Sequence, residues 1–443
     1  MVEDHEHKNT GWLLRKNPVI LNLFTAIFTL GLMGGLLRFL FPFQILDLGG
    51  SEALISWGST FSSMGQIVGL LGVSRLVRER RSTLLVAGGL LSLFALIVGI
   101  TPDGTVLAVA RITEGMGSGL LLILIIRVST EFGPSRGESV GTLLAAMFLG
   151  SAIGQGLAGW TVEYLVLLIM ASQARVIMLV GAAMSVLSAA VLVITVARGV
   201  GGVAEHTALP KHTHGHTHLG AVAKIVSSRR VLLLACVYLI YDFSHGIYTP
   251  GLSILFEGNG IPMEQIGLGY LVGDIVWGIV QVYAGRYVDR VGHLGPLLMS
   301  LIVKGATVIL YPGASSFPLL TSLLIVAGVS EGFLEPSRND AAMSFAGTTE
   351  LVHDHPHHYL ARAQGLSFSL ASHRHEHVHT TGSSEIVSFL QTIGIAGFAM
   401  GSTAGAWLLL QGFFLADLVL VGGVLLVCAG LLSVGLHQRT STS

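Results

Sequence analysis

Charged residues are scarce in this sequence. Lysine, arginine, aspartate and glutamate make up 11% of its 443 residues, whereas a soluble domain carries roughly 25%. The mean hydropathy is +0.73, and 52% of the residues are hydrophobic. So few charges cannot cover the surface of a soluble protein of this size. The composition therefore excludes an ordinary soluble enzyme, a nucleic-acid binder and a disordered chain, and it predicts an all-α protein that crosses a membrane many times.

Cysteine is nearly absent as well. The two cysteines, Cys236 and Cys428, both lie in apolar stretches, so they support neither a disulfide framework nor a cysteine zinc site. The phosphate-binding pattern G-x-x-x-x-G-K-[ST] is also missing, which argues against an ATP-driven pump. We expect no enzymatic activity, no catalytic residue, no required cofactor and no nucleic-acid partner.

Twelve apolar runs are long enough to span a bilayer, which takes roughly 20 residues. The first run is too long for a signal peptide, has no small-residue cleavage site and follows a partly acidic tail, so we expect it to remain as the first helix. The runs lie near 18–43, 52–74, 83–101, 105–127, 138–162, 174–197, 231–256, 264–288, 295–313, 317–340, 385–411 and 413–436.

The basic residues predict the orientation. If the chain starts in the cytoplasm, 20 of its 24 lysines and arginines fall in cytoplasmic tails and loops, among them four after the second run and three after the tenth. Arg38, Arg111 and Lys304 lie inside runs, and only Arg175 falls near an outer loop. Basic residues are enriched on the cytoplasmic side of membrane proteins. We therefore expect a multi-pass plasma (inner) membrane protein with both termini in the cytoplasm.

The two halves of the chain resemble each other. Glu114 recurs as Glu331, 217 residues later, and the segment that starts at Gly72 recurs 213 residues later at Gly285. Such repeats are common in secondary transporters, which bind their substrates near the midplane between two bundles. We expect an N-tail (1–17), a six-helix bundle (18–197), a His-rich central loop (198–230), a second six-helix bundle (231–436) that contains a His-rich loop (341–384), and a C-tail (437–443).

Loop motifs carry a family resemblance. Gly285, Asp289, Arg290 and Gly292 match the pattern G-x-x-x-D-R-x-G-R/K, with His293 in the last position. This pattern resembles that of the major facilitator superfamily of transporters, and the resemblance covers essentially the whole chain. It implies twelve helices in two pseudo-symmetric bundles, alternating access to a central site, and a cytoplasmic gating motif. The first-half copy of that motif is degenerate and retains Gly72, Arg80 and Arg81.

Two further motifs resemble those of this family. Leu107, Arg111, Gly115 and Gly117 have the spacing of its second motif, in which the arginine is linked to proton coupling. In the fifth run, three glycines keep the spacing of a motif found in exporters, although Gln155 stands where proline is usual. These glycines are Gly141, Gly150 and Gly154. Close helix packing is the alternative explanation for them.

Ionisable side chains inside spans are the candidates for the substrate and proton path, because each costs at least ~2.5 kcal/mol at a helix centre. Arg111 and Glu114 are three residues apart and are expected to pair, and so are Asp242 and His245. Glu331 and Glu335, four apart, form a carboxylate pair of the kind that shares a proton. Lys304 is expected to pair with an acid such as Asp274, and Arg38 either lines the path or has a structural role. The candidates are Arg38, Arg111, Glu114, Asp242, His245, Asp274, Glu331 and Glu335.

Histidine is concentrated in polar segments that the topology places in the cytoplasm. In two of these segments it alternates with other residues, so that neighbouring imidazoles in an extended chain point the same way and can converge on zinc, nickel, cobalt or copper. Titration near neutral pH or compositional drift are the alternatives. The alternating residues are His212, His214, His216, His218, His373, His375, His377 and His379.

The leading interpretation is a monomeric antiporter that uses protons to export a small, drug-like or amphipathic solute. Aromatic residues beside Asp242, among them Tyr238 and Tyr241, would hold such a solute by stacking or cation–π contact, unless they serve only for packing. The rival is export of a transition-metal ion, with the histidine segments collecting it and Asp242 and His245 as ligands in the membrane. A third possibility is a membrane sensor that transports nothing.

Overall fold

The computed structural model describes residues 18–73, 80–129, 136–169, 173–197, 229–350 and 381–440, and within these ranges it contains helices and no strands. The first half contributes α2 (Pro18–Asp47), α3 (Glu52–Val68), α5 (Arg80–Ile100), α6 (Gly104–Ser129), α7 (Arg136–Ile169) and α8 (Gln173–Ala197). The second half contributes α10 (Arg229–Tyr248), α12 (Met263–Val291), α13 (Leu294–Leu310), α14 (Phe317–Glu350), α16 (Thr381–Leu410) and α17 (Leu415–Thr440).

Short elements extend three of these helices. A π-helical turn (Gly69–Val73) follows α3, and a 3-10 turn (Tyr311–Gly313) follows α13. A second 3-10 turn (Thr249–Gly251) joins α10 to the short helix α11 (Leu252–Gly258). Pro250 lies in that turn and has no N–H to donate, so the helix is interrupted there.

The twelve predicted spans are confirmed as helices, one for each run. Within the described residues, ten helices are long and apolar enough to cross a membrane. The main difference lies in α14, which continues to Glu350, whereas the sequence predicted a loop from residue 341. The apolar run ends near Asp340, but the alanines that follow favour a helix, so the helix extends beyond the apolar run.

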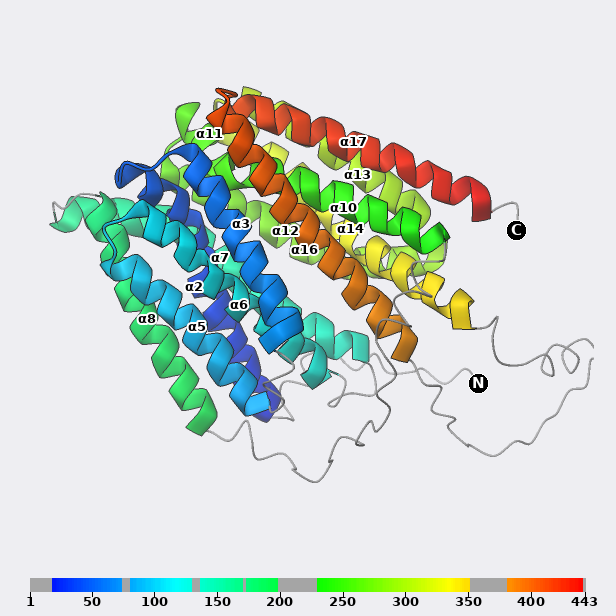
Figure 1. The fold of residues 1–443 in the computed structure, drawn as a ribbon, viewed down its shortest axis with the longest axis horizontal. Coiled ribbons are helices and arrows are strands. Elements are labelled where there is room, and N and C mark those ends of the chain that lie inside the picture. Colours follow the sequence, from blue (N-terminus) through cyan, green and yellow to red (C-terminus); the bar gives the residue numbers. More distant parts are fainter. Residues whose placement is uncertain are drawn as a thin grey trace, which may run out of the picture.

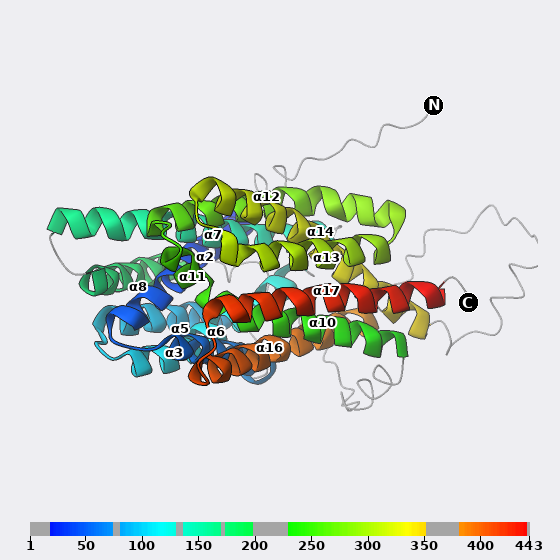
Figure 2. The ribbon, with the colours of Figure 1, turned by 90° about the horizontal axis from the view of Figure 1, so that it is seen from above.

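The two halves pack their helices in the same order. In the first half, α2 packs against α7, α3 against α6, and α5 against α8. In the second half, the corresponding pairs are α10 with α16, α12 with α14, and α13 with α17. Figure 1 shows the first half in blue to teal and the second in green to red, and Figure 2 shows the same helices turned by 90°. The structure thus has two pseudo-symmetric six-helix bundles, as predicted.

Glycines allow the closest of these helices to touch through their backbones. At Gly154 on α7, a Cβ would overlap the carbonyl oxygen of Leu32 on α2, and at Gly401 on α16 it would overlap that of Phe243 on α10. Gly150 packs on α2 in the same way. Because the hydrophobic effect does little to bring helices together inside a bilayer, such close packing contributes much of the stability. The glycines of α7 and α16, each the fifth long helix of its half, therefore have a clear packing role.

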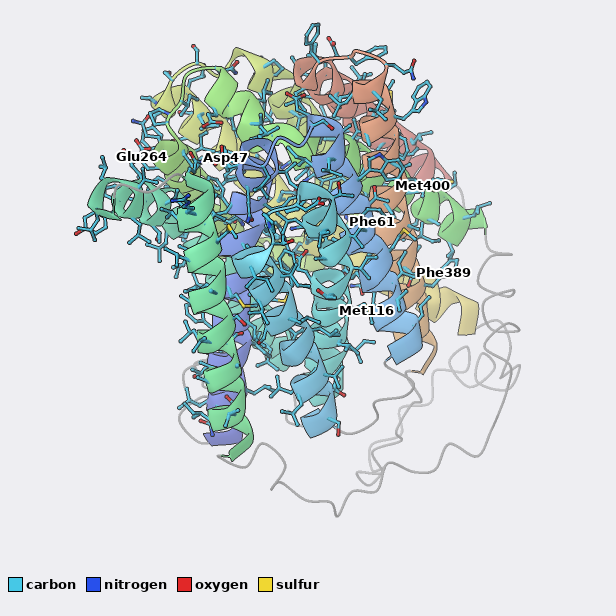
Figure 3. The ribbon with its side chains drawn as sticks, turned by 60° about the vertical axis from the view of Figure 1, so that its left-hand side comes forward. Asp47, Phe61, Met116, Glu264, Phe389 and Met400 are labelled. Atoms are coloured by element: carbon cyan, nitrogen blue, oxygen red, sulfur yellow. The ribbon has the colours of Figure 1, made fainter. Side chains whose placement is uncertain are left out.

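The halves meet along α7 with α12 and α3 with α16. A Cβ at Gly159 would lie 2.6 Å from the carbonyl oxygen of Met263, and the hydroxyls of Thr60 and Thr403 are 3.3 Å apart. Figure 3 labels Phe61 of α3 and Met400 of α16 where these two helices run side by side. Thr60, Gly159, Met263 and Thr403 all lie toward the loops at 48–51 and 259–262, so the halves are in contact at the end that the sequence predicts to face outward.

Candidate functional site

A cavity of about 470 Å³ lies between the two halves and is lined by side chains from both. We call it the central cavity. Its walls come from α2, α3, α6 and α7 on one side and from α10, α11, α12, α14 and α16 on the other. Its polar lining combines the hydroxyl groups of Ser59, Ser62, Ser63, Thr249, Ser253 and Tyr270 with charged, imidazole and amide side chains, which are those of Arg38, Gln66, Arg111, Gln155, Asp242, His245, Glu335, Arg338 and Gln391. The volume and mixed lining suit a small organic molecule.

In the first half, the buried carboxylate of Glu114 is the centre of a cluster formed by Arg38, Ser62, Arg111 and Glu114. Arg38 on α2 lies 3.1 Å from Glu114 Oε1, and Arg111 Nε lies 3.2 Å from Oε2. The Ser62 hydroxyl donates to Oε2 over 2.9 Å. The side chain of Glu114 is 1% exposed, so these contacts replace the water that an ionised carboxylate would otherwise need.

Arg111 is further held by aromatic rings. Its guanidinium group lies 4.7 Å from the centre of the Phe41 ring and 6.0 Å from that of Phe94. Such cation–π contacts favour a charged guanidinium in an apolar setting. The Arg111–Glu114 pair predicted from their spacing is present, and the structure adds Arg38 and Ser62 to it.

In the second half, Glu331 occupies the place that corresponds to Glu114. Lys304 Nζ on α13 lies 3.0 Å from Glu331 Oε1, and the Tyr241 hydroxyl on α10 lies 2.8 Å from Oε1 and 2.7 Å from Oε2. Lys304 thus pairs with an acid, as expected, and that acid is Glu331 and not Asp274, the example given above. A carboxylate that bonds to a cation and a hydroxyl from two other helices ties α14 to α10 and α13.

A second cluster in this half centres on Arg338 and comprises Tyr238, Asp242, Glu335 and Arg338. The guanidinium group lies 3.2 Å from Asp242 Oδ2 and 3.4 Å from Glu335 Oε1. It also lies 3.9 Å from the centre of the Tyr238 ring. The count of basic residues above assigned Arg338 to the loop after the tenth run, although the run itself extends to residue 340, and this assignment is wrong because Arg338 lies within α14. The signal that favoured a buried Arg338 was Glu335, three residues earlier on the same helix face.

Two pairs expected from spacing are not formed. Glu331 and Glu335 have separate cations, Lys304 and Arg338, so they do not act as a carboxylate pair. Like-charged groups in a low dielectric are stabilised better by opposite charges on neighbouring helices than by each other. The other expected pair, Asp242 with His245, gives way to the ion pair between Asp242 and Arg338.

His245 instead lies among aromatic rings. Its ring centre is 5.3 Å from that of Tyr248, 5.8 Å from that of Tyr241 and 6.1 Å from that of Phe398. The residue lines the central cavity, so its imidazole is available to a bound solute.

Asp274, which is half-buried, differs from the carboxylates of these clusters. Within the described residues no lysine, arginine or histidine lies within ion-pair distance of it, and its contact is a hydrogen bond of 3.3 Å from Nε2 of Gln155. Gln155 belongs to α7 and lines the cavity, whereas Asp274 belongs to α12, so this bond joins the two halves. Family exporters usually have a proline at the position of Gln155, and here an amide takes that place.

The loop motif of the second half ends α12. Gly292 adopts φ = +83°, a conformation that favours glycine, and its N–H bonds to the carbonyl of Val288. His293, which replaces the terminal base of the motif, places Nδ1 2.9 Å from Asp340 Oδ2 on α14. Gly285 lies within α12, and Arg290 is exposed near its end.

Several candidates cannot be placed. Gly72 lies in the π-helical turn, and Gly141 lies in α7, but its surroundings are not described. The side chains of Arg80, Arg81 and Asp289 and both alternating histidine segments lie outside the described residues. In the part of the chain that is described, no group of three His, Cys, Asp or Glu side chains is close enough to hold a metal ion.

Comparison with known proteins agrees with this architecture. Residues 23–372 match the model of the Major Facilitator Superfamily. The uncharacterized MFS-type transporter YhcA of Bacillus subtilis (strain 168) is 30% identical over 156 residues, a stretch that covers 34% of this chain and 29% of that protein. The crystal structure of a mutant of the nucleoside transporter NupG superposes with a TM-score of 0.68 at 14% identity, covering 94% of this chain and 99% of that one. At this identity the match to NupG concerns the fold.

Proposed function

Since this chain belongs to the Major Facilitator Superfamily of secondary transporters, we propose that it is a proton-coupled antiporter that exports a small organic solute. It works by alternating access in the plasma membrane, with both termini in the cytoplasm. Members of this family are membrane transporters and not enzymes. What we propose beyond this is the coupling ion, the direction of transport and the class of substrate.

The central cavity is the observation that carries this proposal. It lies between the halves, both halves line it, and the halves touch at the end predicted to face outward. This is the arrangement expected when a transporter of this kind is closed to the outside, because its bundles rock around a site near the midplane. We take the structure to represent the inward-facing state, in which a cytoplasmic solute enters.

Asp274 is the best candidate for the coupling proton. Glu114, Asp242, Glu331 and Glu335 each have a cation within 3.4 Å, so their negative charges are compensated. Asp274 has an amide instead, and an ionised carboxylate held only by an amide is costly in a low dielectric. Binding of a proton removes that cost. Because the carboxylate contacts the opposite half, gain or loss of the proton also changes the contact between the halves.

The experiment that tests the proposal combines two assays. In one, the purified full-length protein is placed in liposomes with an imposed pH gradient, and proton movement is followed while candidate solutes are added. In the other, an overexpressing strain is grown against toxic amphiphiles and against nickel, cobalt and zinc salts. The proposal expects solute-dependent proton movement and protection from organic compounds. No proton movement with any solute would contradict the coupling, and would favour a membrane sensor.

The histidine segments favour a second candidate, export of a transition-metal ion. Their alternating residues, such as His212 and His214, have the spacing for imidazole ligands. A metal exporter would protect cells from nickel, cobalt or zinc and would lose that protection when both segments are deleted. A solute exporter would keep its activity after the same deletion, so one pair of strains separates the two candidates.

A further inference from the structure

Positive charge is in excess on the wall that the first half contributes to the central cavity. Two guanidinium groups, those of Arg38 and Arg111, share the single carboxylate of Glu114. Arg111 is buried against Phe41, but the side chain of Arg38 is 54% exposed. Arg38 also lines the cavity, so it presents donors that Glu114 does not use to whatever occupies that space.

Negative charge is in excess on the opposite wall. There the single guanidinium group of Arg338 is shared by two carboxylates, Asp242 and Glu335. All three side chains line the cavity; Arg338 is buried, while Glu335 is 32% exposed and Asp242 is 19% exposed. The carboxylates therefore retain oxygen atoms that can accept hydrogen bonds from a ligand.

The rest of the lining does not cancel this separation of charge. Lys304 and Glu331 pair with each other, one cation with one carboxylate, and neither residue lines the cavity. The remaining side chains include three amides, Gln66, Gln155 and Gln391, and three rings, Phe39, Tyr270 and Phe398. The central cavity thus has an excess of positive charge on the wall of the first half, an excess of negative charge on the wall of the second half, and neutral polar and aromatic side chains in the rest of its lining.

We infer that the substrate is a zwitterion: a small organic solute with a carboxylate, an ammonium group and an apolar or aromatic body, as in an amino acid or a short peptide. This inference rests on the proposed function and specifies its substrate. The carboxylate of the solute pairs with Arg38, and its ammonium group pairs with Glu335 and Asp242. A solute with a single charge would leave the excess on one wall uncompensated and would be rejected, because an unpaired charge in a desolvated site is costly.

The test uses matched sets of ligands on the full-length protein in detergent. Each set contains a zwitterion, its C-terminal amide, which keeps only the ammonium group, and its N-acetyl derivative, which keeps only the carboxylate. The sets are built on phenylalanine, leucine and alanyl-phenylalanine. Binding is measured by calorimetry at neutral pH. We expect the zwitterion of at least one set to bind about tenfold or more tightly than either derivative, as loss of a charge-assisted hydrogen bond predicts.

Two variants test the assignment of the walls. Arg38→Gln should bring the zwitterion and the amide to similar affinity, and Glu335→Gln should do so for the zwitterion and the N-acetyl derivative. Arg175→Gln and Glu163→Gln, which change exposed side chains outside the cavity, should alter neither ratio. Arg38→Gln leaves Glu114 paired with Arg111, so the buried carboxylate keeps a cation.

The inference is overturned if no set shows a preference for the zwitterion, or if the cavity variants change all three ligands of a set equally. Proton movement in liposomes is recorded with the same ligands. Proton movement with a singly charged or neutral solute, without preference for a zwitterion, would refute this inference and leave proton-coupled transport intact. A zwitterion that binds selectively but moves no protons would support the inference and contradict the coupling.

Discussion

Gln155 on α7 donates a hydrogen bond to Asp274 on α12, and this bond of 3.3 Å connects the two halves of the molecule. The donor lines the central cavity, and the acceptor is a half-buried carboxylate with no cation within ion-pair distance among the described residues. The pair therefore joins the lining of the cavity, the carboxylate that we propose to bind the coupling proton, and the interface between the two halves.

Replacement of Asp274 by asparagine should abolish coupling. Asparagine keeps the size of the side chain and can still accept a hydrogen bond from Gln155, but it cannot ionise. We expect solute-dependent proton movement in liposomes to fall by about tenfold or more while solute binding changes little, since general acid–base groups typically contribute at least that factor. Arg175→Gln, at an exposed position on α8, is the control. Wild-type proton movement in Asp274→Asn would assign the proton to another group.

Replacement of Glu331 by glutamine should destabilise the protein. It leaves Lys304 without its carboxylate in a buried position, and removal of one partner of a buried ion pair costs about 3–5 kcal/mol. The thermal unfolding temperature in detergent is the measurement. The double variant Lys304→Met with Glu331→Gln removes the stranded charge and should recover part of the loss. If the double variant were less stable than Glu331→Gln, the ion pair would not be the origin of the effect.

Alanine at Gly154 should separate α7 from α2. The added Cβ meets the carbonyl oxygen of Leu32, and backbone atoms cannot move aside as a side chain can. The yield of folded protein after solubilisation, measured by size-exclusion chromatography, should fall. Gly278→Ala on α12 is the matched control, because nothing lies within 4 Å of its Cβ position and alanine favours a helix by up to ~1 kcal/mol. Equal yields for both variants would show that contact with α2 does not require Gly154.

Cysteines at positions 60 and 403 should lock the structure closed. The two threonine hydroxyls are 3.3 Å apart across α3 and α16, so a disulfide between the replacements needs little movement. The native Cys236 and Cys428 are exposed and must first be replaced by serine. Oxidation should stop transport in liposomes, and a reductant should restore it. Full transport by the oxidised protein would show that this contact persists through the cycle.

The sequence is sufficient to predict the spans, because an apolar run of roughly 20 residues has few alternatives to a membrane helix. It also predicts the pair of Arg111 with Glu114, since both lie on one turn of the same helix. The partners of Lys304, Asp242 and Asp274 were not predictable in this way. They come from other helices, and the choice among several acids depends on how the helices are rotated and packed.

The same limit applies to helix ends. Arg338 lies close to the end of the tenth apolar run, and the count of basic residues by side of the membrane assigned it to the loop that follows. In the structure the helix continues, and the guanidinium group is buried between two carboxylates and the Tyr238 ring. Hydropathy reports where the lipid ends, whereas helix propensity and buried ion pairs determine where the helix ends.

The turn at Thr249–Gly251 divides the seventh membrane helix into α10, which bears Asp242 and His245, and the seven-residue helix α11. Pro250 has no N–H to donate, so the hydrogen-bond ladder of the helix is interrupted between the two parts. Thr249, Pro250 and Ser253 all line the central cavity, so the break in this helix is itself part of the surface that a bound solute would meet.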